Sequence, residues 1–540
     1  MQISGAQMVI EALIAEGVDT VFGYPGGAIM NVYDEIYKQK SFQHILTRHE
    51  QAAVHAAEGY AKASGKVGVA MITSGPGFTN AVTGLADAYM DSIPLVVISG
   101  QVPMSLIGTD AFQEIDAVGI SRSCTKHNYL VTDAHDLPRI LKEAFYIASS
   151  GRPGPVHVDI PKDVTAQIAE FNYAIELNLE TYKPHTKGNP RQIKKAMEAI
   201  AKAKRPLFYV ETFMARGTLS YDDELLISML GMHGSYAANM AMSETDLVIG
   251  LGARFDDRVT GKLSEFAKNA GVIHVDIDPA SISKLVKADY PIVGDVKNVV
   301  KEMLESIALV NPSRYESWRE TIKNFDELHP LTYHEDSQRL KPQWVIQRVG
   351  ELLGDSANIS TDVGQHQMWA AQFYPFTRPR QWVSSGGLGT MGFGFPAAMG
   401  VKVASPDKIS INFTGDGSIL MNVQELMTAV EKKIPVINII LNNNYLGMVR
   451  QWQTLFYNKR HSETDLSHQP DFVKLAEAFG GIGYRVETKE QFDAALRDAV
   501  ERNIVTFIDV VVERLENVMP MVPAGGSLFN MMLLERGEKK

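Results

Sequence analysis

The sequence contains one cysteine, Cys124, among 540 residues. A single thiol excludes an intrachain disulfide framework, so we expect a reducing compartment, the cytoplasm. The first residues show no charged segment followed by an apolar one, and no apolar run is long enough to span a membrane. Acidic residues outnumber basic ones, 63 to 52, so the formal net charge is −11. We therefore expect no nucleic-acid partner and no membrane.

The composition and the length indicate a globular protein of several domains. Hydrophobic residues make up 45% of the chain and charged residues 21%, which is ordinary for soluble proteins. Helical and strand patterns alternate, which predicts an α/β fold with three doubly wound parallel-sheet domains. We place an N-terminal domain at residues 1–165, a linker at 166–190, a middle domain at 191–330, and a C-terminal domain with a tail at 341–540.

The most informative stretch runs from residue 409 to residue 448. An apolar run ends at Gly415-Asp416-Gly417-Ser418, a helical pattern follows, and a second apolar run leads to Asn443. This order predicts a βαβ unit, whose ligands bind at the carboxyl ends of the strands. Asp416 and Asn443 offer the oxygen atoms that a hard divalent cation prefers. Gly415 and Gly417 let the backbone approach a diphosphate, and the next helix N-terminus favours its charge.

The pattern resembles the cofactor motif of the thiamine diphosphate-dependent enzymes. The resemblance implies that Mg²⁺ is bound by the side chains of Asp416 and Asn443 and by the backbone carbonyl of Tyr445. It also implies that Glu50, where a strand gives way to a helix, hydrogen-bonds the aminopyrimidine ring of thiamine diphosphate. From the residues alone, the favoured interpretation of Glu50 is a first-turn glutamate that the helix dipole stabilises.

Longer motifs are similar to those of the acetohydroxyacid synthase family, catalytic large subunit. They lie at residues 22–28, 109–114, 161–164, 229–234, 254–258 and 447–452. The resemblance implies that pyruvate loses carbon dioxide on thiamine diphosphate and that the remaining two carbons join a second pyruvate or 2-ketobutyrate. The products, 2-acetolactate or 2-aceto-2-hydroxybutyrate, lead to valine, leucine and isoleucine. Two alternatives are a flavin-using pyruvate oxidase-type enzyme and a non-catalytic cofactor-binding scaffold.

The resemblance also suggests which residues bind the substrates. Arg258 would clamp the carboxylate of the second ketoacid, since a guanidinium binds a carboxylate bidentately. Trp452 would shape the pocket for the extra methyl of 2-ketobutyrate. Arg258 could instead form a surface ion pair with Asp256 or Asp257, and Trp452 could be a core residue. The same cavity would be lined by Gly27, Phe112, Gln113, Lys162, Met232 and His233. Lys162 and His233 could equally be structural contacts.

Further cofactor contacts follow from the resemblance. Thiamine diphosphate would be contacted by Gln365, His366, Gly389, Met391, Gly415, Gly417, Ser418 and Met448. Met391 would support the bent form of the cofactor. Family members also carry FAD, although the reaction has no net redox step. The matching FAD residues here are Arg152, Met232, His233, Gly252, Arg254, Asp276, Asp278 and Asp295.

The chain departs from the family after the strand predicted at residues 206–210. A glycine-rich turn, a helix and a second strand should follow, but Val210 is joined directly to Glu211. A parallel strand cannot be reached without a crossover of about a dozen residues. Either these elements were lost or residues are missing at this point. We favour missing residues and predict a physical break between Val210 and Glu211. A real deletion would put FAD binding in doubt.

The predicted site also suggests how chains assemble. Glu50 and the metal ligands lie in different domains, and in this family they come from different subunits. The resemblance therefore implies a homodimer or a homotetramer, and it makes a small regulatory subunit plausible. Residues 453–469 are polar and are expected to form a lid. The segment near 520–526 would fold back toward the pocket, although a frayed terminus is an equal alternative.

Overall fold

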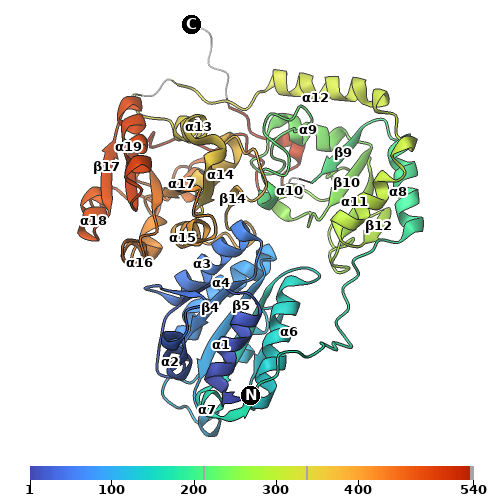
Figure 1. Cartoon of the computed structure of the whole chain (residues 1–540). Helices are drawn as coiled ribbons and strands as arrows, with labels where there is room; N and C mark the ends of the chain where they lie inside the picture. The colour runs from blue at the N-terminus through green and yellow to red at the C-terminus, as the bar shows by residue number, and fades with distance from the viewer. Residues whose placement is uncertain (211–212, 336–337, 535–540) are drawn as a thin grey trace. The chain divides into compact units, whose positions relative to one another are not determined.

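A computed structural model of the chain describes residues 1–210, 213–335 and 338–534 (Figure 1). The chain forms two compact units. Unit 1 consists of Met1–Thr181, Asp355–Gln367 and Arg380–Leu515, and unit 2 consists of Tyr182–Gly354, Met368–Pro379 and Glu516–Lys540. Each unit is described separately.

The first part of unit 1 is a six-stranded parallel sheet. Its order is β3-β2-β4-β5-β7-β6. The strands are β2 (Thr20–Gly23), β3 (Gln43–Leu46), β4 (Gly68–Ile72), β5 (Leu95–Gln101), β6 (His127–Leu130) and β7 (Pro155–Pro161). Every residue of β4, β5 and β7 is buried, because helices cover both faces of a parallel sheet. These helices are α1 (Gly5–Ala15), α2 (Met30–Lys38), α3 (Glu50–Ser64), α4 (Pro76–Asp91), α5 (Ala117–Ser121), α6 (Leu137–Ser149) and α7 (Lys162–Ala166). A separate antiparallel pair joins β1 (Gln2–Ser4) to β8 (Ile168–Glu170).

The second sheet of unit 1 has the same connectivity as the first. Its order is β14-β13-β15-β16-β18-β17. The strands are β13 (Ala357–Thr361), β14 (Trp382–Val383), β15 (Ile409–Gly415), β16 (Val436–Asn442), β17 (Ile482–Val486) and β18 (Thr506–Val511). The helices along this part of the chain are α14 (Gln365–Phe373), α15 (Gly394–Ala404), α16 (Glu425–Glu431), α17 (Gly447–Phe456), α18 (Phe472–Ala478) and α19 (Lys489–Arg502). The predicted βαβ unit is β15 and β16, but its crossover is a 3-10 turn, η7 (Ile419–Asn422), followed by α16.

Unit 2 contains a four-stranded parallel sheet with the order β12-β11-β10-β9. The strands are β9 (Pro206–Tyr209), β10 (Leu247–Leu251), β11 (Gly271–Asp276) and β12 (Tyr290–Val293). One apolar cluster joins the sheet to α8 (Pro190–Lys202) and α11 (Val296–Leu304). A second cluster joins it to α9 (Tyr236–Glu244) and α10 (Asp257–Thr260). Two further helices of this unit are α12 (Glu316–Leu328) and α13 (Pro342–Leu353).

The predicted fold class is confirmed, since three parallel sheets are flanked by helices. The predicted break between Val210 and Glu211 falls at residues 211–212, outside the described residues. Residues 171–189 contain no helix or strand, and the domain bounds stay a prediction. Within the described ranges, no helix has both the length and the apolar character needed to cross a membrane.

Candidate cofactor site

Each six-stranded sheet reverses its strand order at two places, of which the one between inner strands is the candidate for ligand binding. That reversal lies between β2 and β4 in the first sheet and between β13 and β15 in the second. Crossovers leave such a point in opposite directions, so a crevice for ligands opens beyond the carboxyl ends of the strands. The loops that follow these strands carry the predicted motifs, including residues 23–27, 73–76, 362–366 and 415–418. The fold therefore brings the sequence motifs to the positions where α/β proteins bind ligands.

The predicted metal ligands lie at the ends of neighbouring strands. Gly415 of β15 pairs with Leu441 of β16, which places Asp416 and Asn443 on the same sheet edge. Both side chains are buried. Asn443 accepts a hydrogen bond from the backbone amide of Tyr445 at 3.0 Å through its side-chain oxygen. Its amide nitrogen donates to Gln365 at 3.2 Å.

The carboxylate of Asp416 lacks a cationic partner among the described side chains. Burial raises the pKa of Asp416 to about 7, and a hydrogen bond from Gln469 acts in the opposite direction. A buried carboxylate beside an amide oxygen is a donor set that suits a hard divalent cation. The residues present therefore fit Mg²⁺.

His366 supplies a polar atom that the protein leaves without a partner. Its ring is buried, and its Nε2 has no hydrogen-bond partner within the described chain. Burial lowers the pKa of His366 to about 3, so the ring is neutral. A Cβ atom on Gly415 would lie 3.0 Å from Nδ1 of this ring. A buried polar atom without a hydrogen-bond partner destabilises the folded protein. Nε2 of His366 is therefore suited to contact a polar ligand such as a diphosphate.

The glycine-rich loop after β14 is held by acidic residues of α4. Ser385 donates a hydrogen bond to Asp87 at 2.7 Å. The backbone amides of Gly386 and Gly387 donate to Asp91 at 3.0 and 2.7 Å. Gly389 lies four residues after Ser385, is exposed, and has a φ of 71°. The loop predicted to contact the cofactor is thus fixed by side chains of the first sheet's helices.

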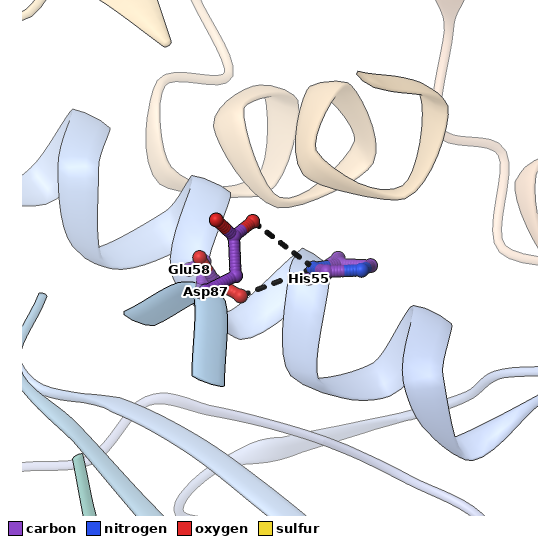
Figure 2. A group of neighbouring side chains, drawn as sticks. All are labelled: His55, Glu58 and Asp87. Carbon is purple, nitrogen blue, oxygen red and sulfur yellow. Dashed lines mark hydrogen bonds and ion pairs between the residues drawn. The ribbon is translucent and has the colours of Figure 1, made fainter. Parts of the chain in front are cut away.

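The same acids belong to a buried ionic cluster, part of which Figure 2 shows. His55 Nδ1 lies 3.0 Å from Glu58 and 3.9 Å from Asp87, and Lys62 lies 3.1 Å from Asp91. Burial and then the Glu58 charge raise the pKa of Asp87 to about 7. Burial lowers the pKa of His55 to about 4 and raises that of Glu58. The pKa of Lys62 is raised overall: burial acts to lower it, but the charges of Asp91 and then of the other acids outweigh burial.

Glu50 is the first residue of α3, and it follows β3. Asn80 donates a hydrogen bond to Glu50 at 3.0 Å, and a Cβ on Gly77 would lie 3.4 Å from the same carboxylate. Glu50 is buried. In the described part of the chain, no hydrogen bond links Glu50 to Asp416 or Asn443. The position suits both interpretations of Glu50, a cofactor contact and a first-turn glutamate.

The predicted cavity residues of the first domain are mostly exposed in the single chain. Phe112 is 87% exposed, and Gly27 and Lys162 are also exposed. Gln113 is partly buried and has a φ of 60°. A Cβ on Gly75, which follows β4, would lie 2.7 Å from the carbonyl oxygen of Gln113. The fold thus places Gln113 beside the reversal between β2 and β4.

In the second sheet, α17 carries two predicted residues, Met448 and Trp452, which are both partly buried. Between them, Gln451 is buried and accepts a hydrogen bond from Gln365 at 2.8 Å. Met391 is partly buried as well. Ser418 accepts a hydrogen bond from the amide of Gly415 at 3.2 Å.

Sequence reasoning missed several side chains around this site. Gln469 contacts Asp416, although residues 453–469 were predicted only as a lid. Gln451 and Asp91 were also missed, and so was Asp362, which accepts the amide of Gly392 at 2.6 Å. Only Asp362 had a usable signal, because it directly follows a strand.

Unit 2 carries the predicted substrate residues Arg258, Met232 and His233. Arg258 is exposed, and its guanidinium lies 3.1 Å from the sulfur of Met232. The ion pair recorded for Asp256 is with Arg254, at 3.6 Å. His233 is buried, and burial lowers its pKa to about 4.

The C-terminal tail packs onto the same turn of unit 2. The backbone of Val522 donates a hydrogen bond to Met232 at 2.7 Å, and the ring of His233 lies 3.4 Å from the carbonyl of Pro520. The tail near residues 520–526 is therefore ordered against this turn and is not frayed.

The residues predicted to contact FAD are already engaged in local structure. Asp276 accepts the amide of Asp278 at 2.8 Å, and Asp278 accepts that of Ala280 at 2.9 Å. Asp295 caps α11. The amide of Gly252, whose φ is 66°, donates to Val275 at 2.8 Å. In unit 1, Arg152 donates to Ser92 at 2.8 Å.

Comparison with known proteins gives matches along the whole chain. The N-terminal TPP binding domain, the central domain and the C-terminal TPP binding domain of thiamine pyrophosphate enzymes match residues 3–120, 208–303 and 362–510. The acetolactate synthase large subunit of Haemophilus influenzae is 47% identical, covering 100% of this chain and 99% of the relative. The acetolactate synthase isozyme 3 large subunit of Escherichia coli is 46% identical over 98% of both chains. A probable acetolactate synthase large subunit of Methanocaldococcus jannaschii is 45% identical, covering 100% of this chain and 96% of the relative.

The alignment with the Haemophilus relative is longer than this chain. The Haemophilus alignment spans 569 positions, whereas this chain has 540 residues. At least 29 positions of the relative therefore have no counterpart in this chain.

Proposed function

The chain belongs to the acetolactate synthase large-subunit family of thiamine diphosphate enzymes, and we propose that it makes 2-acetolactate from two molecules of pyruvate. With 2-ketobutyrate as the second substrate, the product is 2-aceto-2-hydroxybutyrate. One carbon dioxide is released for each product. The chain is thus a carboligating thiamine enzyme, a transferase, in the synthesis of branched-chain amino acids. The similar proteins do not favour the pyruvate oxidase alternative.

The observation that carries the proposal is the donor set at the reversal between β13 and β15. Asp416 is a buried carboxylate without a cationic partner among the described residues, and Asn443 ends the neighbouring strand. We assign Mg²⁺ to these side chains and to the backbone carbonyl of Tyr445. The neutral ring of His366 would offer Nε2 to the diphosphate. The glycines at 415 and 417 leave room for the diphosphate to approach the backbone.

The remaining residues orient the reactants. Thiamine diphosphate, when bound, supplies the electron sink for decarboxylation. Glu50, positioned by Asn80, would hold a proton for the aminopyrimidine ring. Arg258 would bind the carboxylate of the second ketoacid through two parallel hydrogen bonds. Trp452 would contact its alkyl group, which limits any preference between pyruvate and 2-ketobutyrate to about 1–3 kcal/mol.

We also propose that the working enzyme is a homodimer or a homotetramer whose sites are shared between chains. Its support is an exposed set of apolar side chains in the segments after strands of both six-stranded sheets. They are Tyr24, Met30, Leu106, Phe112, Leu388, Met421 and Val449. Since the relatives are named large subunits, a small regulatory subunit is included. The cytoplasmic location stays a prediction, and FAD is not part of the proposal.

The direct test is to incubate the purified chain with pyruvate, thiamine diphosphate and Mg²⁺ and to measure acetolactate against acetate. Acetolactate is expected. Acetate formed with consumption of an electron acceptor would indicate an oxidase, and the absence of both products would indicate a scaffold. The variants Glu50→Gln and Asp416→Asn should each lose activity, by about 10²–10⁴-fold for the acid–base group. The exposed-site variant Asp34→Asn is the control.

Mixing the two inactive variants tests the shared site. If Glu50 of one chain completes the site that contains Asp416 of another, half of the sites in a mixed dimer are intact. Random 1:1 re-association should then restore about a quarter of the wild-type activity. No recovery after confirmed subunit exchange would show that each chain builds its own site.

A further inference from the structure

We infer that this chain does not bind FAD, because the described strands of its middle domain show no reversal of order and most backbone amides of the turn matched to FAD are already hydrogen-bonded. The inference goes beyond the proposed function, which involves no oxidation or reduction. It concerns unit 2 alone and uses only contacts within that unit.

The first argument is topological. In the middle sheet the spatial order of strands follows the chain order, from β9 to β12, without a reversal. The segments that connect these strands contribute residues to one apolar cluster, whereas α8 and α11 contribute to the other. The crevice of a doubly wound sheet opens where neighbouring crossovers depart toward opposite faces. The two six-stranded sheets of unit 1 have such a point, whereas the described strands of the middle sheet form none.

The second argument concerns the end of β9, where a phosphate-binding turn would lie. Tyr209 ends this strand and is buried, with its ring 5.7 Å from that of Phe255. No glycine follows it before Gly217. The chain then leaves the sheet, and the amide of Tyr221 donates to Phe376 at 2.8 Å. Among the described residues the next α-helix begins at Tyr236, so no helix N-terminus in that part of the chain directly follows β9 to receive a phosphate.

The third argument concerns the turn at residues 231–235, one of the segments matched to FAD. A dinucleotide phosphate is held by free backbone amides. Four amides of this turn already donate hydrogen bonds inside the protein, at distances of 2.7–2.9 Å: Gly231, Met232, Gly234 and Ser235. Their acceptors are Asn239 of α9, Arg258, Gly231 of the turn itself and Met229, which precedes the turn. The turn is therefore closed on itself and on its neighbours.

The missing elements explain all three features. The relative from Haemophilus has at least 29 positions without a counterpart here. For this inference we take the departure after Val210 as a real deletion of a glycine-rich turn, a helix and a strand, because the full sequence joins Val210 directly to Glu211. A strand added beyond β9, with its crossover on the opposite face, would create the reversal that the middle sheet lacks.

The test measures flavin rather than activity. The full chain is produced in cells that contain FAD and is purified with thiamine diphosphate and Mg²⁺. It is then denatured, and the released flavin is measured by fluorescence. We expect no stoichiometric flavin and, in equilibrium dialysis, no saturable FAD binding up to about 100 µM. One FAD per chain, or saturation below that concentration, would overturn the inference.

A chimera provides the matched control. The segment of the Haemophilus relative that is absent here is inserted between Val210 and Glu211, and flavin is measured in the same way. Binding by the chimera and not by the natural chain supports the topological cause, whereas a flavin-free chimera refutes it. Acetolactate is assayed in parallel. A flavin-free chain without activity counts against the proposed function and leaves this inference intact.

Discussion

Replacing Asp87 by asparagine is expected to stabilise the protein at pH 8 and to flatten its loss of stability between pH 5 and pH 8. Asp87 lies in the buried cluster with His55 and Glu58 (Figure 2). Burial and the Glu58 charge raise the pKa of Asp87 from 3.8 to about 7. The folded protein therefore keeps a proton that the unfolded chain releases above pH 4. The stabilisation is complete below the unfolded pKa and is lost as the pH rises through the folded pKa.

The size of the effect follows from these two pKa values. Raising a carboxyl pKa from 3.8 to about 7 corresponds to a loss of about 4 kcal/mol between pH 4 and pH 8. Asparagine keeps the neutral form at every pH. Its side-chain oxygen can still accept the 2.7 Å hydrogen bond from Ser385. At about 1 °C per kcal/mol for a chain of this length, the midpoint of thermal unfolding should rise by up to about 4 °C at pH 8.

The assay is thermal unfolding at half-unit pH steps from 5 to 8 for the natural chain and for Asp87→Asn. The control is Asp34→Asn, which removes an exposed acid paired with Lys38 at 2.7 Å and should change stability by less than about 1 kcal/mol. Identical pH profiles for the natural chain and Asp87→Asn would refute the reasoning. The cluster would then hold Asp87 as an anion, with Lys62 as its counter-charge.

Three further outcomes are expected. Gly415→Ala places a Cβ 3.0 Å from the ring of His366. It should weaken the binding of thiamine diphosphate, measured by titration, by about tenfold or more, which corresponds to about 1.4 kcal/mol. An unchanged affinity would contradict the assigned contact between His366 and the diphosphate. Arg258→Lys should raise the KM for the second ketoacid by at least about tenfold, because a lysine cannot form the bidentate pair with its carboxylate. An unchanged KM would favour a structural role for Arg258. Trp452→Leu should change the ratio of the two products by about 10–200-fold at most. The ratio is measured with pyruvate and 2-ketobutyrate in competition. An unchanged ratio would show that Trp452 does not contact the second substrate.

The candidate metal site could be predicted well from the sequence. The Gly415-Asp416-Gly417 turn and Asn443 each follow an apolar run, and strand ends in a βαβ unit share one edge of the sheet. The positions of Asp416 and Asn443 are therefore set by short-range patterns. Gln469 could not be found in this way, because its contact with Asp416 spans 53 residues of chain and depends on how the segment after α17 folds back.

The middle domain shows a different limit. The sequence revealed that the chain departs from the family pattern after Val210, because the expected glycines and helix do not follow this residue. It could not tell which strand β9 would pair with once that element was gone. The structure pairs β9 directly with β10, since the segment that contains α9 is long enough to serve as the crossover.

By itself, the sequence determined the α/β class, the two strand-end motifs and the point where the chain departs from its relatives. These depend on residue types at short spacing and on hydrophobic periodicity. Only the tertiary structure decided the order of strands in each sheet and the burial of His366 and Asp87. It also decided the hydrogen bond between the loop at Ser385 and the acidic side chain of Asp87 on α4. Such features arise from contacts between segments far apart in the chain, whose free energy depends on packing and desolvation and not on local pattern.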